Sequence, residues 1–252
     1  MKEKISEIKE ELKQTAPEDM AAFIARHEAD PREGAARIVQ SARRKLAAYQ
    51  KEEDRVYSML AYERRYAGEG PICGIDEAGR GPLAGPVVAA AVILKPEDPI
   101  FYVNDSKKLS AARREKLFEE IMDRAAGVGV GIADAARIDQ INILQADYEA
   151  MREAAGSLPL APSLALNDAV TIPELGIRQI PIIHGDALSL SIAAASIIAK
   201  VTRDRMMMEY DRIYPEYGFA SHKGYGTAQH IKALQTYGPC PIHRRSFITH
   251  FI

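Results

Sequence analysis

The sequence predicts an α/β fold, with a β-sheet flanked by helices and a small helical appendage in front of it. From residue 72 onward, short apolar runs rich in β-branched residues alternate with helical patterns. Residues 1–66 instead show helical spacing of apolar residues, interrupted only by prolines. Glycines and a proline punctuate 67–71, so we expect a helical extension over 1–66 and a main domain over 67–252.

The elements follow from local patterns. Ile5, Ile8 and Leu12 recur at helical spacing, and residues 35–65 form a long stretch without proline, so both are expected to be helical. Runs of β-branched and apolar residues predict strands at 72–75, 87–94, 101–103, 128–132, 163–166 and 179–183.

Helices are expected between and after these strands. Ser110 is a good N-cap for a helix through Arg124, with Leu117 and Ile121 on one face, and further helices should follow up to residue 155. Residues 187–210 predict a long helix whose first half is Ala, Ser and Ile, small enough to lie buried against the sheet. A short helix is expected near 227–235.

The composition is that of an ordinary globular protein. With 252 residues, 47% of them hydrophobic, the chain can bury a real core, which excludes a disordered or collagen-like chain. The longest run with little charge, 187–199, is shorter than the ~20 apolar residues of a membrane-spanning helix. The first residues do not resemble a secretory signal, so a cytoplasmic location is expected. Cys73 and Cys240 are expected to be free thiols.

Charge is distributed unevenly along the chain. Residues 67–199 carry 11 basic against 18 acidic side chains, whereas 200–252 carry 8 against 4 and four of the six histidines. An acidic middle followed by a basic tail would place carboxylates beside a surface that attracts polyanions. Solvated faces explain the same counts equally well.

Acidic residues stand at the ends of predicted strands. Asp76 and Glu77 end the first strand, and Asp168 and Asp186 follow two later ones. Hard divalent cations take oxygen ligands, and a pair of ions ~3.5–4 Å apart needs carboxylates from several strands. The pattern therefore indicates a metal site. The alternative is that each acid caps the following helix, which would suit Asp186 in particular.

Three further segments can contact a polyanion. The glycines of 79–85 allow close backbone approach to a sugar or phosphate, without a GxxxxGK[ST] or GxGxxG pattern; a tight turn is the alternative. Around Tyr225, a ring that can stack on a base or sugar stands beside two basic residues, although Tyr225 can equally pack at a domain edge. Lys107 offers a phosphate contact, and 243–245 form a basic cluster that is most often a surface feature. No GxSxG nucleophile motif is present.

Several long motifs resemble one known family. The strings GIDEAGRGPLAGPVVAAAVIL, NDSKKLS, GDALSLSIAAASIIAKVTRDR and HKGYGT occur in that order over roughly residues 70–250, and they resemble ribonuclease HII. The resemblance implies an RNase H-like mixed sheet flanked by helices. It also implies an endonuclease that cuts 5′ of a ribonucleotide, in an RNA–DNA hybrid or embedded in duplex DNA, leaving 3′-hydroxyl and 5′-phosphate ends. Such an enzyme removes misincorporated ribonucleotides and RNA primers.

Site residues follow from the same resemblance. The implied catalytic acids, which would hold two Mg²⁺ or Mn²⁺ ions, are Asp76, Glu77, Asp168 and Asp186. The residues implied to contact substrate are Gly79, Arg80 and Gly81 at the ribonucleotide, Lys107 at a phosphate and Tyr225 at the following sugar. The expected partners are RNA–DNA hybrid and ribonucleotide-containing duplex DNA, with no membrane, and the protein is expected to be a monomer.

Two positions depart from the family pattern. His184 stands where lysine is usual, which would make a phosphate contact weaker and dependent on pH. Asn167 replaces an apolar residue before the third acid. Two alternatives remain: an enzyme of the ribonuclease HIII type, against which the compact GRG segment argues, and a module that binds hybrids without cutting, against which the four acids argue.

Overall fold

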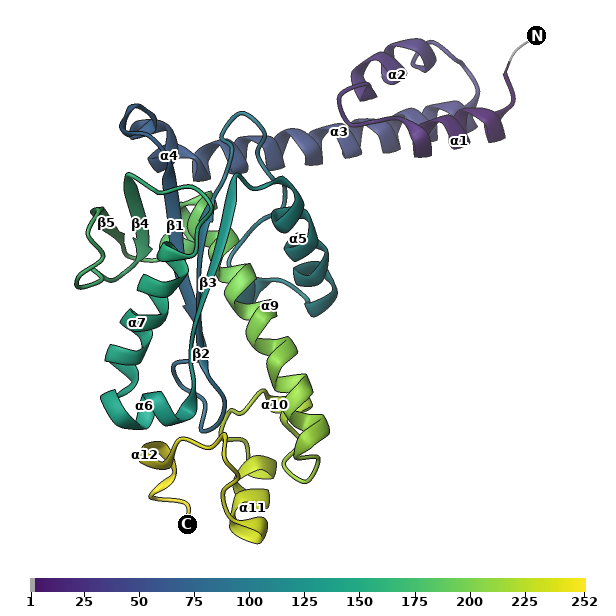
Figure 1. Cartoon of the computed structure of the whole chain (residues 1–252). Helices are drawn as coiled ribbons and strands as arrows, with labels where there is room; N and C mark the ends of the chain where they lie inside the picture. The colour runs from purple at the N-terminus through teal and green to yellow at the C-terminus, as the bar shows by residue number, and fades with distance from the viewer. Residues whose placement is uncertain (1–2) are drawn as a thin grey trace. The chain divides into compact units, whose positions relative to one another are not determined.

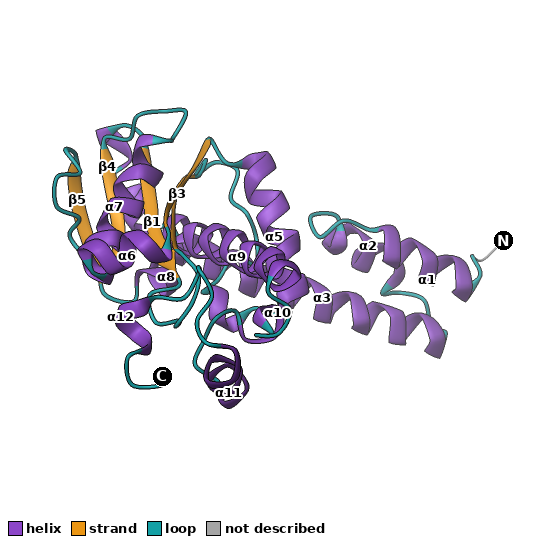
Figure 2. Ribbon diagram, turned by 60° about the horizontal axis from the view of Figure 1, so that its bottom comes forward, coloured by secondary structure: helices purple, strands orange, loops and turns teal. Residues whose placement is uncertain are grey.

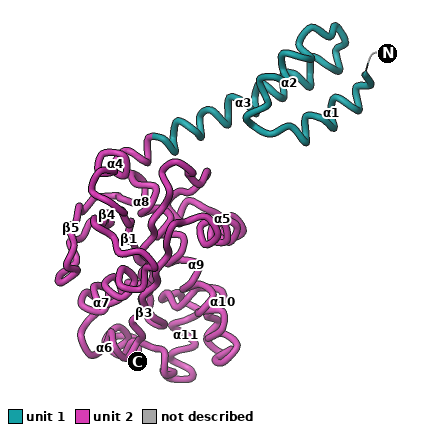
Figure 3. Tube along the Cα trace, turned by 45° about the horizontal axis from the view of Figure 1, so that its top comes forward, with its two compact units in different colours: residues 1–57 teal, residues 58–252 magenta. Residues whose placement is uncertain are grey.

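The computed structural model describes residues 3–252 (Figure 1). It separates into two compact units, Met1–Tyr57 and Ser58–Ile252 (Figure 3). Helix α3 (Glu33–Met59) runs through this division, and α4 (Ala61–Arg65) belongs to the second unit. In α4, Glu63 accepts hydrogen bonds from the Ser189 hydroxyl at 2.7 Å and the Ser191 N–H at 3.0 Å. Residues 58–66 therefore pack with the sheet-containing unit.

The first unit is helical, as expected, and three helices form it. It consists of α1 (Ile5–Gln14), α2 (Met20–His27) and the N-terminal part of α3. Apolar side chains from all three helices form its core: Ile8, Leu12, Met20, Phe23, Ile24, Ala35, Ile38, Val39 and Ala42. The helical spacing of the sequence is thus confirmed, because one apolar stripe on each helix meets the others.

The second unit contains a mixed sheet, which confirms the expected fold class (Figure 2). Its strands are β1 (Ile72–Ala78), β2 (Val87–Ile93), β3 (Gly127–Ala133), β4 (Leu164–Asp168) and β5 (Arg178–Ile182), in the order β3-β2-β1-β4-β5. The pairs β1–β2 and β2–β3 are antiparallel, whereas β1–β4 and β4–β5 are parallel. The strand expected at 101–103 is wrong: a turn stands there, with Tyr102 in the left-handed region at φ 65°.

Helices cover both faces of the sheet (Figure 2). One face carries α9 (Leu190–Ile213) and α5 (Ala111–Arg124), and the other carries α6 (Ala135–Ile141) and α7 (Ile143–Gly156). Helix α9 lies so close to β1 that a Cβ on Gly74 would overlap the backbone of Ser191. The small residues of α9 permit this approach, as the sequence predicts. The Ser110 hydroxyl caps α5 by accepting from the Arg113 N–H at 3.3 Å, which is also as predicted.

The helix expected over 187–210 begins later than predicted. Residues Gly185–Leu188 form a separate short helix, α8, and Ser189 between α8 and α9 is extended (φ −124°, ψ 131°). Its hydroxyl accepts a hydrogen bond from the Ile192 N–H at 3.3 Å and so caps α9. A serine side chain competes for backbone donors in this way, which apolar periodicity alone does not reveal.

Short helices complete the chain: α10 (Phe219–His222), α11 (Ala228–Tyr237) and α12 (Arg245–Ile248). Both cysteines are buried free thiols, as expected. Asn167 is buried within the sheet, where its amide donates to the side chain of Gln179 at 2.8 Å. Within residues 3–252, no helix combines the length and the apolar character needed to cross a lipid bilayer.

Candidate active site

Asp76 and Glu77 lie at the C-terminal end of β1 and point to opposite faces of the sheet, because side chains alternate along a strand. Asp76 is 4% exposed and points toward α9, where the Ser196 hydroxyl hydrogen-bonds to it. Its Oδ1 also accepts from the Glu77 N–H at 2.8 Å. Glu77 points toward the face covered by α7. Two adjacent acids thus meet different surroundings.

Asp168 and Asp186 reach the same edge from other elements. The parallel register pairs Ile75 with Asn167, so Asp168, at the end of β4, stands beside Asp76. Its Oδ1 accepts a hydrogen bond from the Gly185 N–H at 2.7 Å. That bond holds the start of α8, the helix that carries the buried Asp186. The structure therefore gathers at one sheet edge the four acids that the sequence predicts.

This edge carries an excess of negative charge. Burial, and then the charges of Glu77 and Asp168, raise the pKa of Asp76 well above its usual range. Burial also raises the pKa of Glu77, against the opposing effect of Arg80. The pKa of Asp186 is raised by burial and by the nearby charges of Asp105 and Asp168. The carboxyl groups of Asp76, Glu77 and Asp186 are therefore harder to ionise here than in water.

Two cations approach these acids. The Lys107 Nζ lies 3.6 Å from the Asp186 Oδ2. Burial lowers the pKa of Lys107, but the neighbouring carboxylates outweigh it and raise that pKa above its usual value. The Arg80 guanidinium lies 3.7 Å from the Glu77 Oε1. A donor set made only of carboxylate oxygens, with too few cations to balance it, fits a hard divalent cation.

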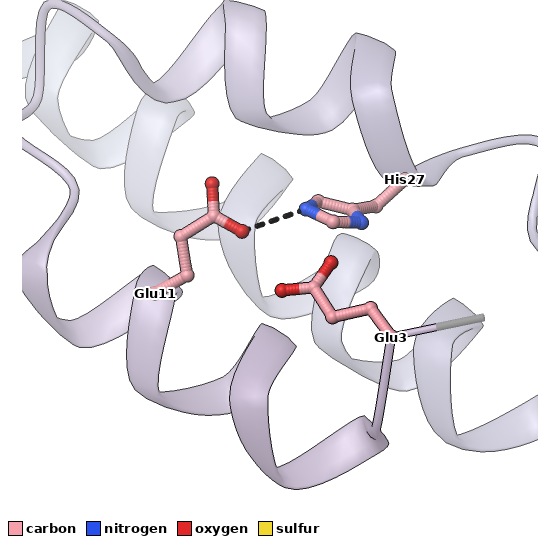
Figure 4. Close-up of side chains that lie close together, drawn as sticks. All are labelled: Glu3, Glu11 and His27. Carbon is pink, nitrogen blue, oxygen red and sulfur yellow. Dashed lines mark hydrogen bonds and ion pairs between the residues drawn. The ribbon is translucent and has the colours of Figure 1, made fainter. Parts of the chain in front are cut away.

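The carboxylate oxygens of the four acids are not closely clustered. In the part of the chain that the structure describes, the only three ligand atoms of different residues that lie within 4.8 Å of one another come from Glu3, Glu11 and His27 in the first unit (Figure 4). There, Glu11 pairs with His27 at 2.9 Å and with Arg26 at 2.6 Å, which makes an ion-pair cluster.

The glycine segment 79–86 is held by two buried arginines. Arg203 of α9 donates to the carbonyl oxygens of Pro86 at 2.9 Å and Ala84 at 3.0 Å. Arg244 donates to those of Arg80 at 2.8 Å and Gly85 at 3.0 Å. Burial lowers the pKa of both guanidinium groups, that of Arg244 to about 9. The two buried guanidinium groups thus hold in place the backbone that follows Asp76 and Glu77.

The basic cluster 243–245 is only partly a surface feature. Arg245 is exposed, but Arg244 and His243 are buried at 0% and 2% exposure. The surface interpretation is wrong for these two residues, because Arg244 donates to backbone carbonyl groups of the glycine segment and His243 contacts the buried His230. Sequence reasoning also gives no role to Arg203, for which the only signal is a charge within an otherwise buried helix.

Tyr225 lies next to the glycine segment. Its side chain is 46% exposed, and a Cβ built on Gly81 would stand 3.9 Å from the Tyr225 Cε1. The Leu83 N–H donates to the Gly224 carbonyl at 2.9 Å, which ties the two segments together. The exposed ring therefore stands beside the glycines and is free to stack on a planar or sugar surface.

Two hydrogen-bonded histidines, His230 and His243, form a chain that contacts the backbone of Tyr225. The Cys240 N–H donates to the His243 Nδ1 at 3.0 Å, so the His243 Nε2 carries the proton and donates to the His230 Nε2 at 3.0 Å. His230 then donates from Nδ1 to the Tyr225 carbonyl at 2.9 Å. The Cys240 N–H at one end and the Tyr225 carbonyl at the other thus determine which nitrogen of each histidine carries the proton. The three-residue spacing of Cys240 and His243 is the signal that sequence reasoning passes over.

Two solved structures share this fold at 30% sequence identity. One is the ribonuclease H2 from Pyrococcus horikoshii OT3, with a TM-score of 0.59, covering 70% of this chain and 93% of that one. The other is from the PCNA:RNase HII complex of Archaeoglobus fulgidus, with a TM-score of 0.60, covering 71% of this chain and 94% of that one. A mixed sheet with this acidic edge is accordingly that of a ribonuclease H, a class of nucleases.

Within that class, the chain belongs to the ribonuclease HII family. The family model for ribonuclease HII matches residues 73–250, and that for the ribonuclease HII N-terminal domain matches residues 4–67. The ribonuclease HII of Lachnoclostridium phytofermentans is 55% identical over 245 residues, which are 97% of this chain and 96% of that protein. The resemblance noted in the sequence and the enzyme class that it implies are confirmed.

Proposed function

We propose that this protein hydrolyses the phosphodiester on the 5′ side of ribonucleotides, both in RNA–DNA hybrids and at single ribonucleotides embedded in duplex DNA. The products carry 3′-hydroxyl and 5′-phosphate ends. In the cell this reaction removes misincorporated ribonucleotides and RNA primers. The observation that carries the proposal is the gathering of Asp76, Glu77, Asp168 and Asp186 beside the fixed glycine segment and the exposed Tyr225.

Those four acids would hold two Mg²⁺ or Mn²⁺ ions, with Asp76 as the shared ligand. Asp76 suits that role because it stands beside Asp168 in the sheet and the charges of both Glu77 and Asp168 act on its carboxyl group. When bound, such ions activate the attacking water and stabilise negative charge on the leaving 3′ oxygen. The protein's own contribution is to hold the acids rigidly at the sheet edge, through the Gly185–Asp168 bond and the Ser196 hydroxyl.

The glycine segment would recognise the ribonucleotide. Gly79, Arg80 and Gly81 can approach the 2′-hydroxyl, the group that distinguishes RNA from DNA, because Arg244 holds the carbonyl groups of Gly79 and Arg80 in place. The Tyr225 ring would stack on the sugar that follows the ribonucleotide. Lys107, whose side chain is 78% exposed beside Asp186, would hold a phosphate.

We also propose that the enzyme acts as a monomer in the cytoplasm. Its partners would be RNA–DNA hybrid and ribonucleotide-containing duplex DNA. Sedimentation of the full chain at micromolar concentration tests the monomer, which should give a mass near 27.8 kDa. A stable mass of twice that value would contradict it.

The decisive experiment uses a labelled DNA duplex that holds one ribonucleotide, with Mg²⁺, with Mn²⁺ and with chelator. The proposal predicts a metal-dependent cut immediately 5′ of the ribonucleotide, and no cut in an all-DNA duplex of the same sequence. Asp76→Asn should lower the cleavage rate by roughly 10²–10³-fold while much of the hybrid binding remains. Cleavage of a long hybrid alone would favour a ribonuclease HIII-like activity, and binding without any cleavage would leave a hybrid-binding module.

A further inference from the structure

A buried acid that the proposed mechanism does not use lies behind the active site. Asp147 of α7 is 0% exposed. Among residues 3–252, neither of its carboxylate oxygens finds a hydrogen-bond partner. Its neighbours on the buried face of α7 are Ala146, Ala150, Met151 and Ala154. A buried carboxylate without hydrogen bonds is costly, so an apolar or amide side chain would serve packing better.

Among residues 3–252, Asp147 forms one ion pair, with Arg80. The Asp147 Oδ2 lies 3.5 Å from the Arg80 Nε, and the Arg80 Nη1 lies 3.7 Å from the Glu77 Oε1. Glu77 comes to this guanidinium because it points to the α7 side of β1, opposite to Asp76. One arginine is therefore shared between a fully buried acid and a candidate metal ligand.

This sharing decides where the charge of Arg80 acts. The Arg80 carbonyl is held by Arg244 at 2.8 Å, so the side chain pivots from a fixed backbone. Without Asp147, the guanidinium would have Glu77 as its nearest carboxylate. An arginine paired with a carboxylate competes directly with a cation for the same oxygens.

We propose that Asp147 is a positioning residue that draws Arg80 away from Glu77 and so keeps the Glu77 carboxylate available to a divalent cation. The Arg80 side chain remains 43% exposed in this arrangement, so it can still reach a nucleic acid. This inference rests on the proposed function, since it takes Glu77 as a metal ligand.

The test is a double-mutant cycle with Mn²⁺ alone, measured by calorimetric titration of the full chain without nucleic acid at pH 8.5, above the Asp147 pKa of about 8. Asp147→Asn keeps the shape of the side chain and should raise the Mn²⁺ dissociation constant roughly five- to ten-fold. The same change made in an Arg80→Ala background should alter that constant less than about two-fold, because no guanidinium is left to redirect. The Arg80→Ala background thus distinguishes an effect of Asp147 that acts through Arg80 from the direct effect of removing one negative charge near the cation.

A second readout excludes a merely structural role. Raising Mg²⁺ should restore the cleavage rate of Asp147→Asn toward the wild-type value, and Asp147→Glu should retain tighter Mn²⁺ binding than Asp147→Asn. An equal loss of Mn²⁺ affinity in both backgrounds would overturn the inference while the proposed function stands. If the wild type itself binds no Mn²⁺ and cuts no ribonucleotide-containing duplex, both the proposed function and the inference fail.

Discussion

The Arg203 Nε donates a hydrogen bond to the Pro86 carbonyl at 2.9 Å, from beneath the glycine segment that borders the acids. These residues lie 117 positions apart in the chain. Arg203 is 1% exposed, so its guanidinium has exchanged water for the backbone carbonyls that it holds. The segment beside the candidate catalytic acids is therefore tied to the folded core. Its geometry should respond to substitutions that disturb Arg203.

Substituting Gly79 tests this packing. Gly79 has φ +99°, and a Cβ there would overlap the side chain of Arg203. Gly79→Ala should lower the free energy of unfolding by about 2–4 kcal/mol, from left-handed strain together with overpacking. Urea unfolding measures this. Gly81→Ala is the matched control, because its Cβ would meet only Tyr225, at 3.9 Å, and it should change stability little. Equal losses in both variants would contradict the packing argument.

The Ser196 hydroxyl should set the pH at which Asp76 ionises. Burial and the Glu77 charge raise the pKa of Asp76, and the hydrogen bond from Ser196 lowers it. In Ser196→Ala that pKa should rise further. As the pH is lowered, the variant should therefore lose metal-dependent cleavage at a higher pH than the wild type does, and at pH 6 it should cleave several-fold more slowly. Ser106→Ala is the control, since Ser106 contacts Ser196 at 2.9 Å. The pH–rate profiles decide: an equal shift in both variants would argue against a direct effect of Ser196.

The histidine chain behind Tyr225 should make stability depend on mildly acidic pH. Burial lowers the pKa of His243 to about 4, whereas an unfolded histidine titrates near about 6.5. The contribution of the neutral His243 side chain to the free energy of unfolding is therefore complete above about pH 6.5 and is lost as the pH falls toward about 4. His243→Ala should therefore cost about 1–3 kcal/mol at pH 7.5 and less at pH 5.

Urea unfolding at pH 7.5 and at pH 5 measures both values. His250→Ala removes an exposed histidine and should change neither. A loss for His243→Ala that does not vary with pH would show that His243 acts through packing alone.

Asp147 should reduce the stability of the metal-free protein at alkaline pH. Burial, and then the Glu77 charge, raise the pKa of Asp147 to about 8, against the opposing effect of Arg80. Because the folded pKa lies above the unfolded one, ionisation costs folding free energy as pH rises from about 4 to about 8. Asp147→Asn should thus be more stable than the wild type by a few kcal/mol at pH 8.5, with the difference vanishing near pH 4.

Unfolding in chelator at the two pH values checks this. A less stable Asp147→Asn at pH 8.5 would contradict it. A variant that gains stability while it loses metal affinity shows the trade between stability and activity expected of a functional residue.

Local patterns in the sequence determined most of the elements. Apolar β-branched runs placed all five strands to within a few residues, and Ser110 marked the start of α5. Long motifs identified the family and named the four acids, because residues that serve one chemistry recur in fixed local strings. The predictions from periodicity were wrong at two places, the strand at 101–103 and the start of the helix over 187–210. There the left-handed Tyr102 and the helix cap Ser189 changed the backbone path.

Tertiary structure alone decided which charges are buried and what they contact. Arg244 lies in a basic string, yet it is buried and reaches the Gly79 carbonyl across 165 positions. Asp147 stands in a helix where its sequence neighbours give no sign of Arg80 or Glu77. Periodicity reports which face of an element is apolar, whereas the partner of a buried charge depends on how separate elements pack. The sequence by itself therefore determined the elements and the family and named the candidate acids. Only the packing of the sheet with α7 and α9 decided how those acids are held and charged.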